Sequence, residues 1–154
     1  ATSGSALVLG SGGAARAILF SLLEAGVPKI YLSNRTKARS IKLAKKLSTK
    51  IQVVDWDSKE DYLSEIVILV NTTSLGMQGK PPLSLDLSSL NPKTLVTDLV
   101  YSPLETKLLR EAKAIGCDVV GGIGMLIYQG VPGFKEWFGT TPKVDGEIMK
   151  LITK

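Results

Sequence analysis

The sequence predicts an α/β fold in which a doubly wound parallel sheet lies between two layers of helices. Short apolar runs, typical of buried parallel strands, alternate along the 154 residues with segments of helical periodicity. The first run is followed directly by a glycine-rich turn and a helical segment. This alternation implies right-handed crossovers and predicts a single domain with the strand order 3-2-1-4-5-6. A ligand is expected at the carboxyl ends of strands 1 and 4, where the order reverses.

The glycine-rich turn follows a first strand expected over residues 6–9 and reads G-x-G-x-x-A from Gly10 to Ala15. This is the dinucleotide fingerprint of the Rossmann fold. Gly10 permits a tight turn, Gly12 lets a pyrophosphate approach the backbone, and Ala15 lets the helix pack closely on the strands. The N–H groups where that helix begins, near Gly13, favour an anion. A plain turn is the alternative, but the strand before the motif and the helix after it favour a nucleotide.

The end of the second strand, expected over residues 30–32, indicates which dinucleotide binds. NAD-binding domains place Asp or Glu about 20 residues after the glycines, where it contacts the ribose 2′-hydroxyl. Here Ser33 and Asn34 occupy that position and Arg35 follows, whereas Glu24 and Asp55 are badly placed. An arginine can bind a 2′-phosphate through two charge-assisted hydrogen bonds, although a solvated loop arginine is the alternative. The predicted cofactor is therefore NADP.

The positive charge of the chain is local. The formal net charge is +5, yet residues 34–50 contain seven basic residues and no acidic one, so the remainder sums to −2. This distribution favours one anionic ligand site and disfavours a nucleic-acid surface spread over the domain. No aromatic residue interrupts the basic run, which also disfavours single-strand binding. Much of the run is compatible with a solvated helix face from which only Arg35 and Arg39 reach the ligand.

The remaining elements follow in order. Residues 1–5 are expected to be a flexible linker remnant that precedes the NADP-binding domain of residues 6–154. A helix over 37–47 has Thr36 as its candidate N-cap and Ile41, Ala44 and Leu47 facing inward. Strands are expected at 51–54, 66–70, 95–98 and 118–120, and helices at 58–63, 104–115, 124–138 and 142–153, the last with Thr141 as N-cap. Residues 79–92 read as a loop rich in Pro and Ser.

Two of the expected helices have features that affect the site. Gly130, Pro132 and Gly133 weaken the middle of the helix at 124–138, and Pro132 removes a backbone donor there. The closing helix carries an apolar stripe made by Val144, Ile148, Leu151 and Ile152. This stripe must pack on its own domain, pair with another molecule or remain exposed.

The composition excludes several kinds of site. Cys117 is the only cysteine and the chain contains no histidine, so an internal disulfide and a Cys/His zinc site are excluded, and no metal is expected. The apolar N-terminal stretch is broken by glycines and lacks a basic leader, and no apolar run reaches about 18 residues. We therefore expect no signal peptide, no membrane span and a cytoplasmic location.

Four motifs in order resemble the NADP-binding C-terminal domain of shikimate dehydrogenase. The first combines the glycine turn of residues 10–17 with Asn34, Arg35 and Thr36. Residues 71–77 read N-T-T-S-L-G-M, residues 98–106 read D-L-V-Y-S-P-L-E-T, and residues 122–129 read G-I-G-M-L-I-Y-Q. Because the four motifs span nearly the whole chain, the resemblance is far more specific than the glycine turn alone.

The resemblance implies a role for individual residues. Leu99, Gly122 and Met125 would surround the nicotinamide, although Met125 also reads as an ordinary core residue. Tyr101 and Gln129 would reach the substrate, shikimate, from this side of the cleft. The other implied cofactor contacts are to the pyrophosphate by Gly10, Ser11, Gly12, Gly13 and Ala14, to the 2′-phosphate by Asn34, Arg35, Thr36 and Arg39, and to the ribose by Thr72 and Ser74.

The resemblance also implies a function, which is hydride transfer between NADPH and 3-dehydroshikimate in chorismate and aromatic amino-acid biosynthesis. The family's catalytic lysine–aspartate pair lies in an N-terminal substrate domain, and none of the lysines here matches it. We therefore expect residues 1–154 alone to be inactive, and an oligomer is compatible with the sequence. Two alternatives stay open: a non-catalytic dehydrogenase-like sensor module of a regulator, and a dehydrogenase acting on quinate or another carbonyl.

Overall fold

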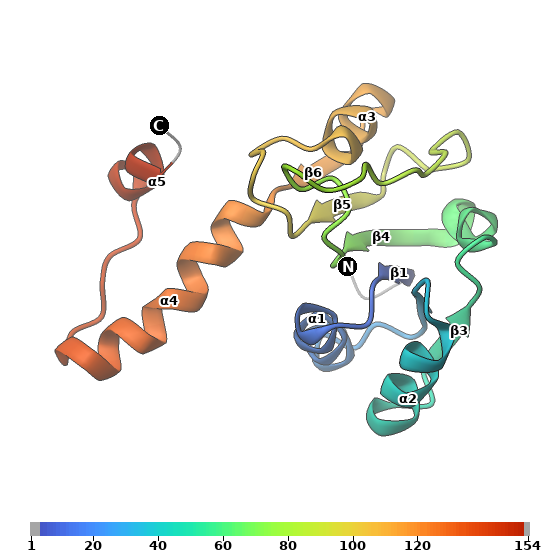
Figure 1. The fold of residues 1–154 in the computed structure, drawn as a ribbon, viewed down its shortest axis with the longest axis horizontal. Helices are drawn as coiled ribbons and strands as arrows, with labels where there is room; N and C mark the ends of the chain where they lie inside the picture. Colours follow the sequence, from blue (N-terminus) through green and yellow to red (C-terminus); the bar gives the residue numbers. More distant parts are fainter. Residues whose placement is uncertain (1–3, 153–154) are drawn as a thin grey trace.

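The computed structural model describes residues 4–152 and has the predicted architecture (Figure 1). Six parallel strands form one sheet in the order β3-β2-β1-β4-β5-β6, which confirms the predicted fold class and strand order. The elements of this fold are β1 (Ser5–Leu9), α1 (Gly13–Glu24), β2 (Ile30–Ser33), α2 (Lys37–Leu47), β3 (Ile51–Val54), the 3-10 helix η1 (Lys59–Glu65), β4 (Ile66–Asn71), β5 (Leu95–Asp98), α3 (Lys107–Ile115), β6 (Asp118–Val120), α4 (Gly122–Phe138) and α5 (Gly146–Ile152).

The core has two halves, one on each face of the sheet. Strands β1 and β4 are neighbours in the middle of the sheet, with Leu7 opposite Leu69, and are apolar along nearly their whole length because both of their faces are covered. Helices α1 and α2 cover one face, where Leu19 and Leu43 join the apolar cluster. Helix α3 and η1 cover the opposite face. The point where the strand order reverses, between β1 and β4, therefore lies at the centre of a buried sheet.

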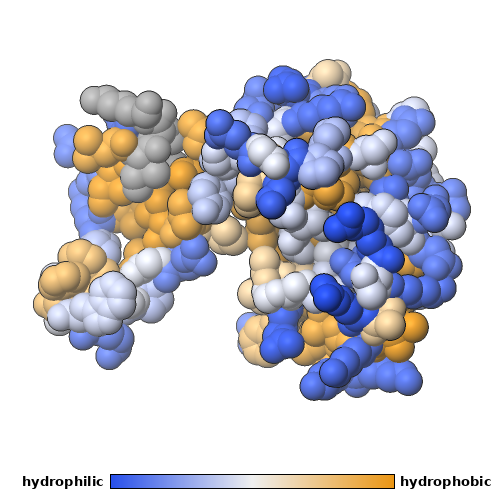
Figure 2. Space-filling view, in the orientation of Figure 1, coloured by the Kyte–Doolittle hydropathy of each residue, from blue (hydrophilic) through white to orange (hydrophobic). Residues whose placement is uncertain are grey.

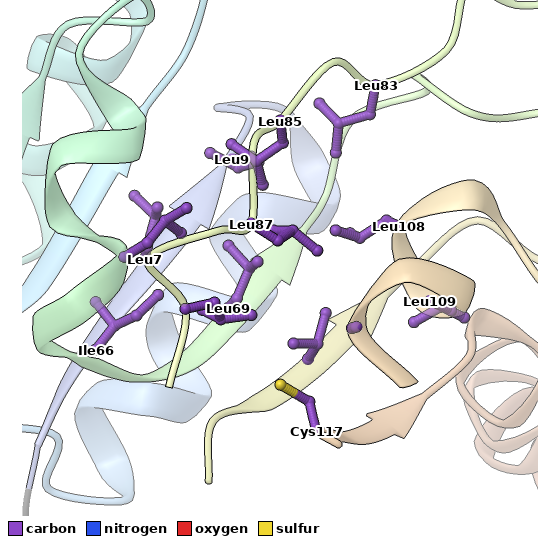
Figure 3. Close-up of a cluster of buried hydrophobic side chains, with 14 of the residues drawn as sticks. Leu7, Leu9, Ile66, Leu69, Leu83, Leu85, Leu87, Leu108, Leu109 and Cys117 are labelled. Carbon is purple, nitrogen blue, oxygen red and sulfur yellow. The ribbon is translucent and has the colours of Figure 1, made fainter. Parts of the chain in front are cut away.

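The connection from β4 to β5 contains an extended segment where a crossover helix would be usual. Residues 79–92, which read as a loop, carry four buried leucines, namely Leu83, Leu85, Leu87 and Leu90. Figure 3 shows Leu83, Leu85 and Leu87 between the strand leucines and α3. Alternating residues of an extended chain point to the same side, so every second residue from Leu83 to Leu87 is buried in the core and the residues between them are exposed. This segment therefore replaces one helix of the outer layer.

Several expected boundaries are wrong. Strand β1 begins at Ser5, so residue 5 belongs to the sheet rather than to a linker. Helix α3 begins at Lys107 instead of 104 because the Thr106 hydroxyl accepts a hydrogen bond from the Leu109 N–H and caps it. The helix expected over residues 58–63 is a 3-10 helix over residues 59–65. Ile41, expected to face inward, is 39% exposed, because α2 turns Ser40, Leu43 and Ala44 toward the sheet. Thr36 is the N-cap residue of α2, but its side chain makes no capping bond.

Helices α4 and α5, hereafter the arm, extend away from the sheet (Figure 1). Helix α4 continues through Pro132 to Phe138, and Gly122 is its only buried residue within the described part of the chain. Figure 2 shows apolar residues gathered on the arm and an open space between it and the body. No helix in residues 4–152 is both long enough and apolar enough to cross a membrane.

The closing helix is shorter than expected and packs on α4. It begins at Gly146 instead of 142, because the Asp145 carboxylate accepts hydrogen bonds from the Glu147 and Ile148 N–H groups and takes the capping role assigned to Thr141. Val144 and Ile148 face α4 across an apolar groove, while Leu151 is 70% exposed. Residue 153 and the side chain of Ile152 lie outside the described part. Val144 and Ile148 of the stripe therefore face α4 rather than the sheet.

Candidate functional site

A pocket of about 260 Å³ opens at the carboxyl ends of β1, β2, β3 and β4, at the predicted switch point. It is built from the turn after β1, the loop after β2, one residue after β3 and the segment after β4. Its lining residues are Gly10, Ser11, Gly12, Asn34, Arg35, Arg39, Trp56, Thr72, Thr73, Ser74 and Leu75. Eight residues predicted from the sequence therefore lie around one cavity, although they come from positions up to 64 residues apart.

The glycine turn leaves room for a ligand above the backbone. Gly10 has a φ of +107°, and a Cβ there would lie 2.5 Å from Thr72 Oγ1, so only glycine fits. At Gly12 and Gly13 a Cβ would meet nothing within 4 Å, which means that the space where a side chain would stand is open. The start of α1 therefore presents a cradle of the shape and polarity that a pyrophosphate requires.

Hydrogen bonds between neighbouring strand ends hold the turn in place. The Gly10 N–H donates to the Ser33 carbonyl at 2.8 Å, which joins the ends of β1 and β2. On the other side, the Thr72 N–H and hydroxyl both donate to the Leu9 carbonyl, at 2.8 and 2.7 Å. The turn is thus fastened to both adjacent strands. Because the Thr72 hydroxyl donates to the Leu9 carbonyl, the Thr72 side chain stabilises the glycine turn and also lines the pocket.

Two arginines line the pocket and no carboxylate does, among the residues that the structure describes. The loop carrying Arg35 is ordered by Thr36, whose carbonyl accepts bonds from the Asn34 amide and the Arg39 N–H, each at 3.0 Å. Asp55, the nearest carboxylate along β3, forms an ion pair with Lys37 at 2.7 Å outside the pocket. The pocket wall after β2 is therefore cationic, as a phosphate site would be.

A buried polar network supports the wall formed by residues 72–75. The Asp98 carboxylate accepts hydrogen bonds from the Asn71 amide at 2.9 Å, the Val100 N–H at 3.0 Å and the Thr106 hydroxyl at 2.7 Å. Asn71 in turn accepts from the Thr73 N–H and hydroxyl. Burial raises the pKa of Asp98, while the three hydrogen bonds oppose that shift. This network joins the ends of β4 and β5 to the start of α3.

The residues assigned to the nicotinamide and substrate lie outside this pocket. Gly122 packs closely against the residue that follows β5, because an added Cβ would lie 2.3 Å from the Leu99 carbonyl oxygen. Close packing therefore explains why this residue is a glycine. Met125 and Tyr101 are 37% and 40% exposed, and Gln129 is exposed one turn after Met125. The pocket lining also omits Gly13, Ala14 and Thr36. For these residues the sequence-based roles stay predictions.

Three pocket residues were missed by the sequence analysis, namely Trp56, Thr73 and Leu75. Trp56 follows β3 closely, so its place at the carboxyl edge of the sheet could have been inferred from the strand assignment. Thr73 and Leu75 alternate with the predicted Thr72 and Ser74. Only the network around Asn71 turns this segment so that all four residues face the cavity.

Two family models match the chain. The model of shikimate / quinate 5-dehydrogenase covers residues 1–77, and that of the shikimate 5′-dehydrogenase C-terminal domain covers residues 122–146. A curated relative from Cereibacter sphaeroides strain KD131, named shikimate dehydrogenase (NADP(+)), is 53% identical over 97% of this chain and 54% of its own length. One of the same name from Jannaschia is 49% identical over 99% of this chain and 55% of its own.

Solved structures agree with these matches. The quinate dehydrogenase of Corynebacterium glutamicum in complex with NAD has a TM-score of 0.88 at 30% identity, covering 98% of this chain and 55% of that one. The shikimate 5-dehydrogenase of Thermus thermophilus in complex with NADP(H) and shikimate has a TM-score of 0.79 at 38% identity, covering 93% and 52%. The chain spans about half the length of the curated relatives it matches. The chain belongs to the shikimate / quinate dehydrogenase family.

Proposed function

We propose that this chain is the NADP-binding domain of an oxidoreductase that transfers a hydride between NADPH and 3-dehydroshikimate. The observation that carries the proposal is the pocket at the switch point, which combines an open glycine cradle with Arg35 and Arg39 and has no carboxylate among its described lining residues. The names of the curated relatives, which specify NADP(+), support the same cofactor.

Each part of the pocket has a task in holding this cofactor. The N–H groups of Gly12 and Gly13 would bind the pyrophosphate, and Ser11 and Ala14 lie in the same turn. Asn34, Arg35, Thr36 and Arg39 would hold the 2′-phosphate, and Thr72 and Ser74 the adjoining ribose. The nicotinamide supplies the hydride when it is bound. The protein's contribution is orientation, with Leu99, Gly122 and Met125 beside the ring and Tyr101 and Gln129 toward the substrate.

The arginine assignment is tested by measuring cofactor affinity. Hydrogen bonds to charged groups contribute about 1.5–3 kcal/mol, so Arg35→Ala should weaken NADP binding about 10- to 150-fold. NAD lacks the 2′-phosphate, and its affinity should hardly change. Lys50→Ala, in the same basic run but outside the pocket lining, is the matched control. Calorimetric titration with both cofactors gives the answer, and equal affinity of the unmutated protein for NAD and NADP would contradict the proposal.

A quinate dehydrogenase is the second candidate, and one comparison favours it. The structure with a TM-score of 0.88 is a quinate dehydrogenase in complex with NAD. That enzyme is 30% identical to this chain, whereas the two curated relatives named for shikimate and NADP(+) are 53% and 49% identical. Steady-state oxidation of shikimate and of quinate by the full-length protein, each with NAD and NADP, separates the candidates. A higher kcat/KM for quinate with NAD would favour the second.

A further inference from the structure

A second cavity of about 260 Å³ lies between α1 and α2, beside the cofactor pocket. Its lining residues are Ser11, Arg16, Arg39, Lys42, Leu43 and Lys46. Ser11 and Arg39 also line the cofactor pocket, whereas the other four do not. We call this cavity the interhelix pocket. It is a crevice between two helices on one face of the sheet, and it opens next to the proposed 2′-phosphate position.

The interhelix pocket concentrates positive charge without a counterion. Arg39, Lys42 and Lys46 are three and four residues apart, so they project from one face of α2, and Arg16 lies on α1. None of these four cations takes part in an ion pair within residues 4–152, in contrast to Lys37 on the same helix. Like charges at these spacings destabilise a helix, and a bound anion would relieve that repulsion.

A serine residue lines the interhelix pocket together with the cations. The Ser11 Oγ exposes less than 1 Å² and has no hydrogen-bond partner among the described residues. Buried hydroxyl groups are normally hydrogen-bonded, so this one leaves a donor available at the edge of the cationic cavity. Leu43 is the only apolar side chain in the lining. Four cations and a free hydroxyl form a suitable environment for a phosphate group.

We propose that the interhelix pocket is a second anion site, which binds inorganic phosphate or a phosphate monoester separately from the cofactor's 2′-phosphate. Lys46 lies seven residues beyond Arg39, which corresponds to about 10 Å along the helix. The interhelix pocket therefore extends along α2 away from the loop that carries Arg35, which lines only the cofactor pocket. Because Arg39 lines both pockets, an anion bound in the interhelix pocket competes with the 2′-phosphate for the Arg39 guanidinium. Phosphate then weakens NADP binding more strongly than NAD binding, because only NADP carries the 2′-phosphate.

Direct titration of the full-length protein with inorganic phosphate, at constant ionic strength, tests the site itself. In the double variant Lys42→Ala/Lys46→Ala, phosphate should bind at least tenfold more weakly. The control Lys45→Ala/Lys50→Ala removes the same charge from α2 and its exit, outside the pocket, and should bind phosphate normally. Arg35→Ala should also keep phosphate binding. Equal loss in the control would indicate a diffuse charge effect, loss in Arg35→Ala would place phosphate in the 2′-phosphate position, and either result overturns the proposal.

The coupling to the cofactor rests on the proposed function and is measured separately. Phosphate should raise the Kd for NADP in the unmutated protein and in the control variant, but not in Lys42→Ala/Lys46→Ala. If phosphate competes equally well in that variant, the interhelix pocket is not the site of competition and the proposal is wrong. Should NADP prove not to be the cofactor, the direct phosphate titration still decides whether the interhelix pocket binds anions.

Discussion

At the scale of single residues, Asp98 supports the pocket wall although it does not line the pocket. Its carboxylate receives three hydrogen bonds from Asn71, Val100 and Thr106 in a buried position. Through Asn71 it orders Thr73 and the pocket wall after β4. A buried acceptor with several donors leaves each of them unsatisfied when it is removed. The pocket wall therefore depends on a residue that no ligand needs to touch.

Removing this acceptor should destabilise the fold measurably. We expect Asp98→Ala to lower the free energy of unfolding by about 2–4 kcal/mol, because three buried donors lose their partner. Urea denaturation measures the difference. Asp86→Ala, an exposed aspartate in the leucine segment, is the comparison and should cost much less. A loss at Asp98 no greater than that at Asp86 would show that the network is not structurally important.

The same residue predicts a pH dependence of stability. Burial raises the pKa of Asp98 above its ordinary value of 3.8, so folding favours the protonated form. Its stabilising contribution is then complete below pH 3.8 and is lost as the pH rises through the raised pKa. Asp98→Asn is neutral throughout, so its stability relative to the unmutated protein should increase over this window. Unfolding measured at several pH values would contradict this if the unmutated protein gained stability relative to the variant.

At the scale of elements, the segment of alternating leucines between β4 and β5 is the least usual part of the fold. It covers one face of the sheet without forming a helix, and its leucines join strand residues such as Leu7 and Leu69 in one core cluster. Extended backbone suits this task because its side chains alternate, so one chain can bury every second residue. The stability of this face thus depends on individual leucines more than on helical propensity.

Truncating a single leucine side chain in this segment should therefore lower the free energy of unfolding as much as truncating a buried leucine in a helix. Leu87 is 5% exposed, and Leu87→Ala should lower the free energy of unfolding by about 2–4 kcal/mol through lost burial and a cavity. Ser84→Ala, on the exposed side of the same segment, should change it by less than about 0.5 kcal/mol. Chemical denaturation of both variants makes the test. Similar small effects would mean that the segment is only loosely attached.

The arm presents the opposite situation, with regular helices that bury little. Helix α1 buries Ala15 and Leu19 against the sheet, whereas Gly122 is the only buried residue of α4 in its described part. Trp137 is 81% exposed and Leu151 is 70% exposed. Helices in proteins owe most of their stability to tertiary packing. In dilute monomer, we expect amide hydrogens of α4 after its first turn and of α5 to exchange faster than those of α1.

Hydrogen exchange followed by mass spectrometry resolves these segments. Helix α3, which buries Leu108, Leu109 and Ala112, is the internal reference and should be protected like α1. Protection of α5 equal to that of α1 would show that the apolar groove between α4 and α5 stabilises the arm by itself. The groove lined by Val144 and Ile148 would then act as a second small core.

At the scale of the whole molecule, the cofactor pocket lies on the sheet, and the residues assigned to the substrate lie where the arm begins. Gly122 seats the start of α4 against the Leu99 carbonyl, and Gln129 lies two turns further along that helix. The chain spans about half the length of its curated relatives. The proposed dinucleotide pocket thus lies on the sheet, and the residues proposed to face the substrate lie at the start of the arm.

We therefore expect a polypeptide limited to residues 1–154 to bind NADP without reducing 3-dehydroshikimate at an enzymatic rate. The resemblance implies that the catalytic lysine–aspartate pair lies outside this segment, and general acid–base catalysis alone contributes about 10²–10⁴-fold. NADPH oxidation followed by absorbance, with the full-length protein as the positive control, measures the difference. Turnover by residues 1–154 at the full-length rate would contradict the assignment of catalysis to another part of the protein.

Local spacing in the sequence predicts the strands and the glycine turn, and the alternation of strands with helices predicts the strand order. Apolar runs such as residues 66–70 indicate buried strands, and Gly10, Gly12 and Ala15 occupy positions that a strand–turn–helix unit dictates. Arg35 was predictable for the same reason, since it lies two residues after the last residue of the second strand. Ile41 and the start of α5 were misassigned, because periodicity gives the face of a helix only approximately and two candidate caps compete.

Which distant residues share a cavity depends on how the elements pack in three dimensions. Trp56 joins the cofactor pocket because β3 ends at the same edge of the sheet as β1. The leucines of residues 83–90 became core because the β4–β5 crossover lacks a helix. Arg16 meets Lys42 and Lys46 because α1 and α2 lie side by side on one face. These contacts arise from the packing of one element on another, whereas the periodicity of the sequence predicts only the individual helices and strands.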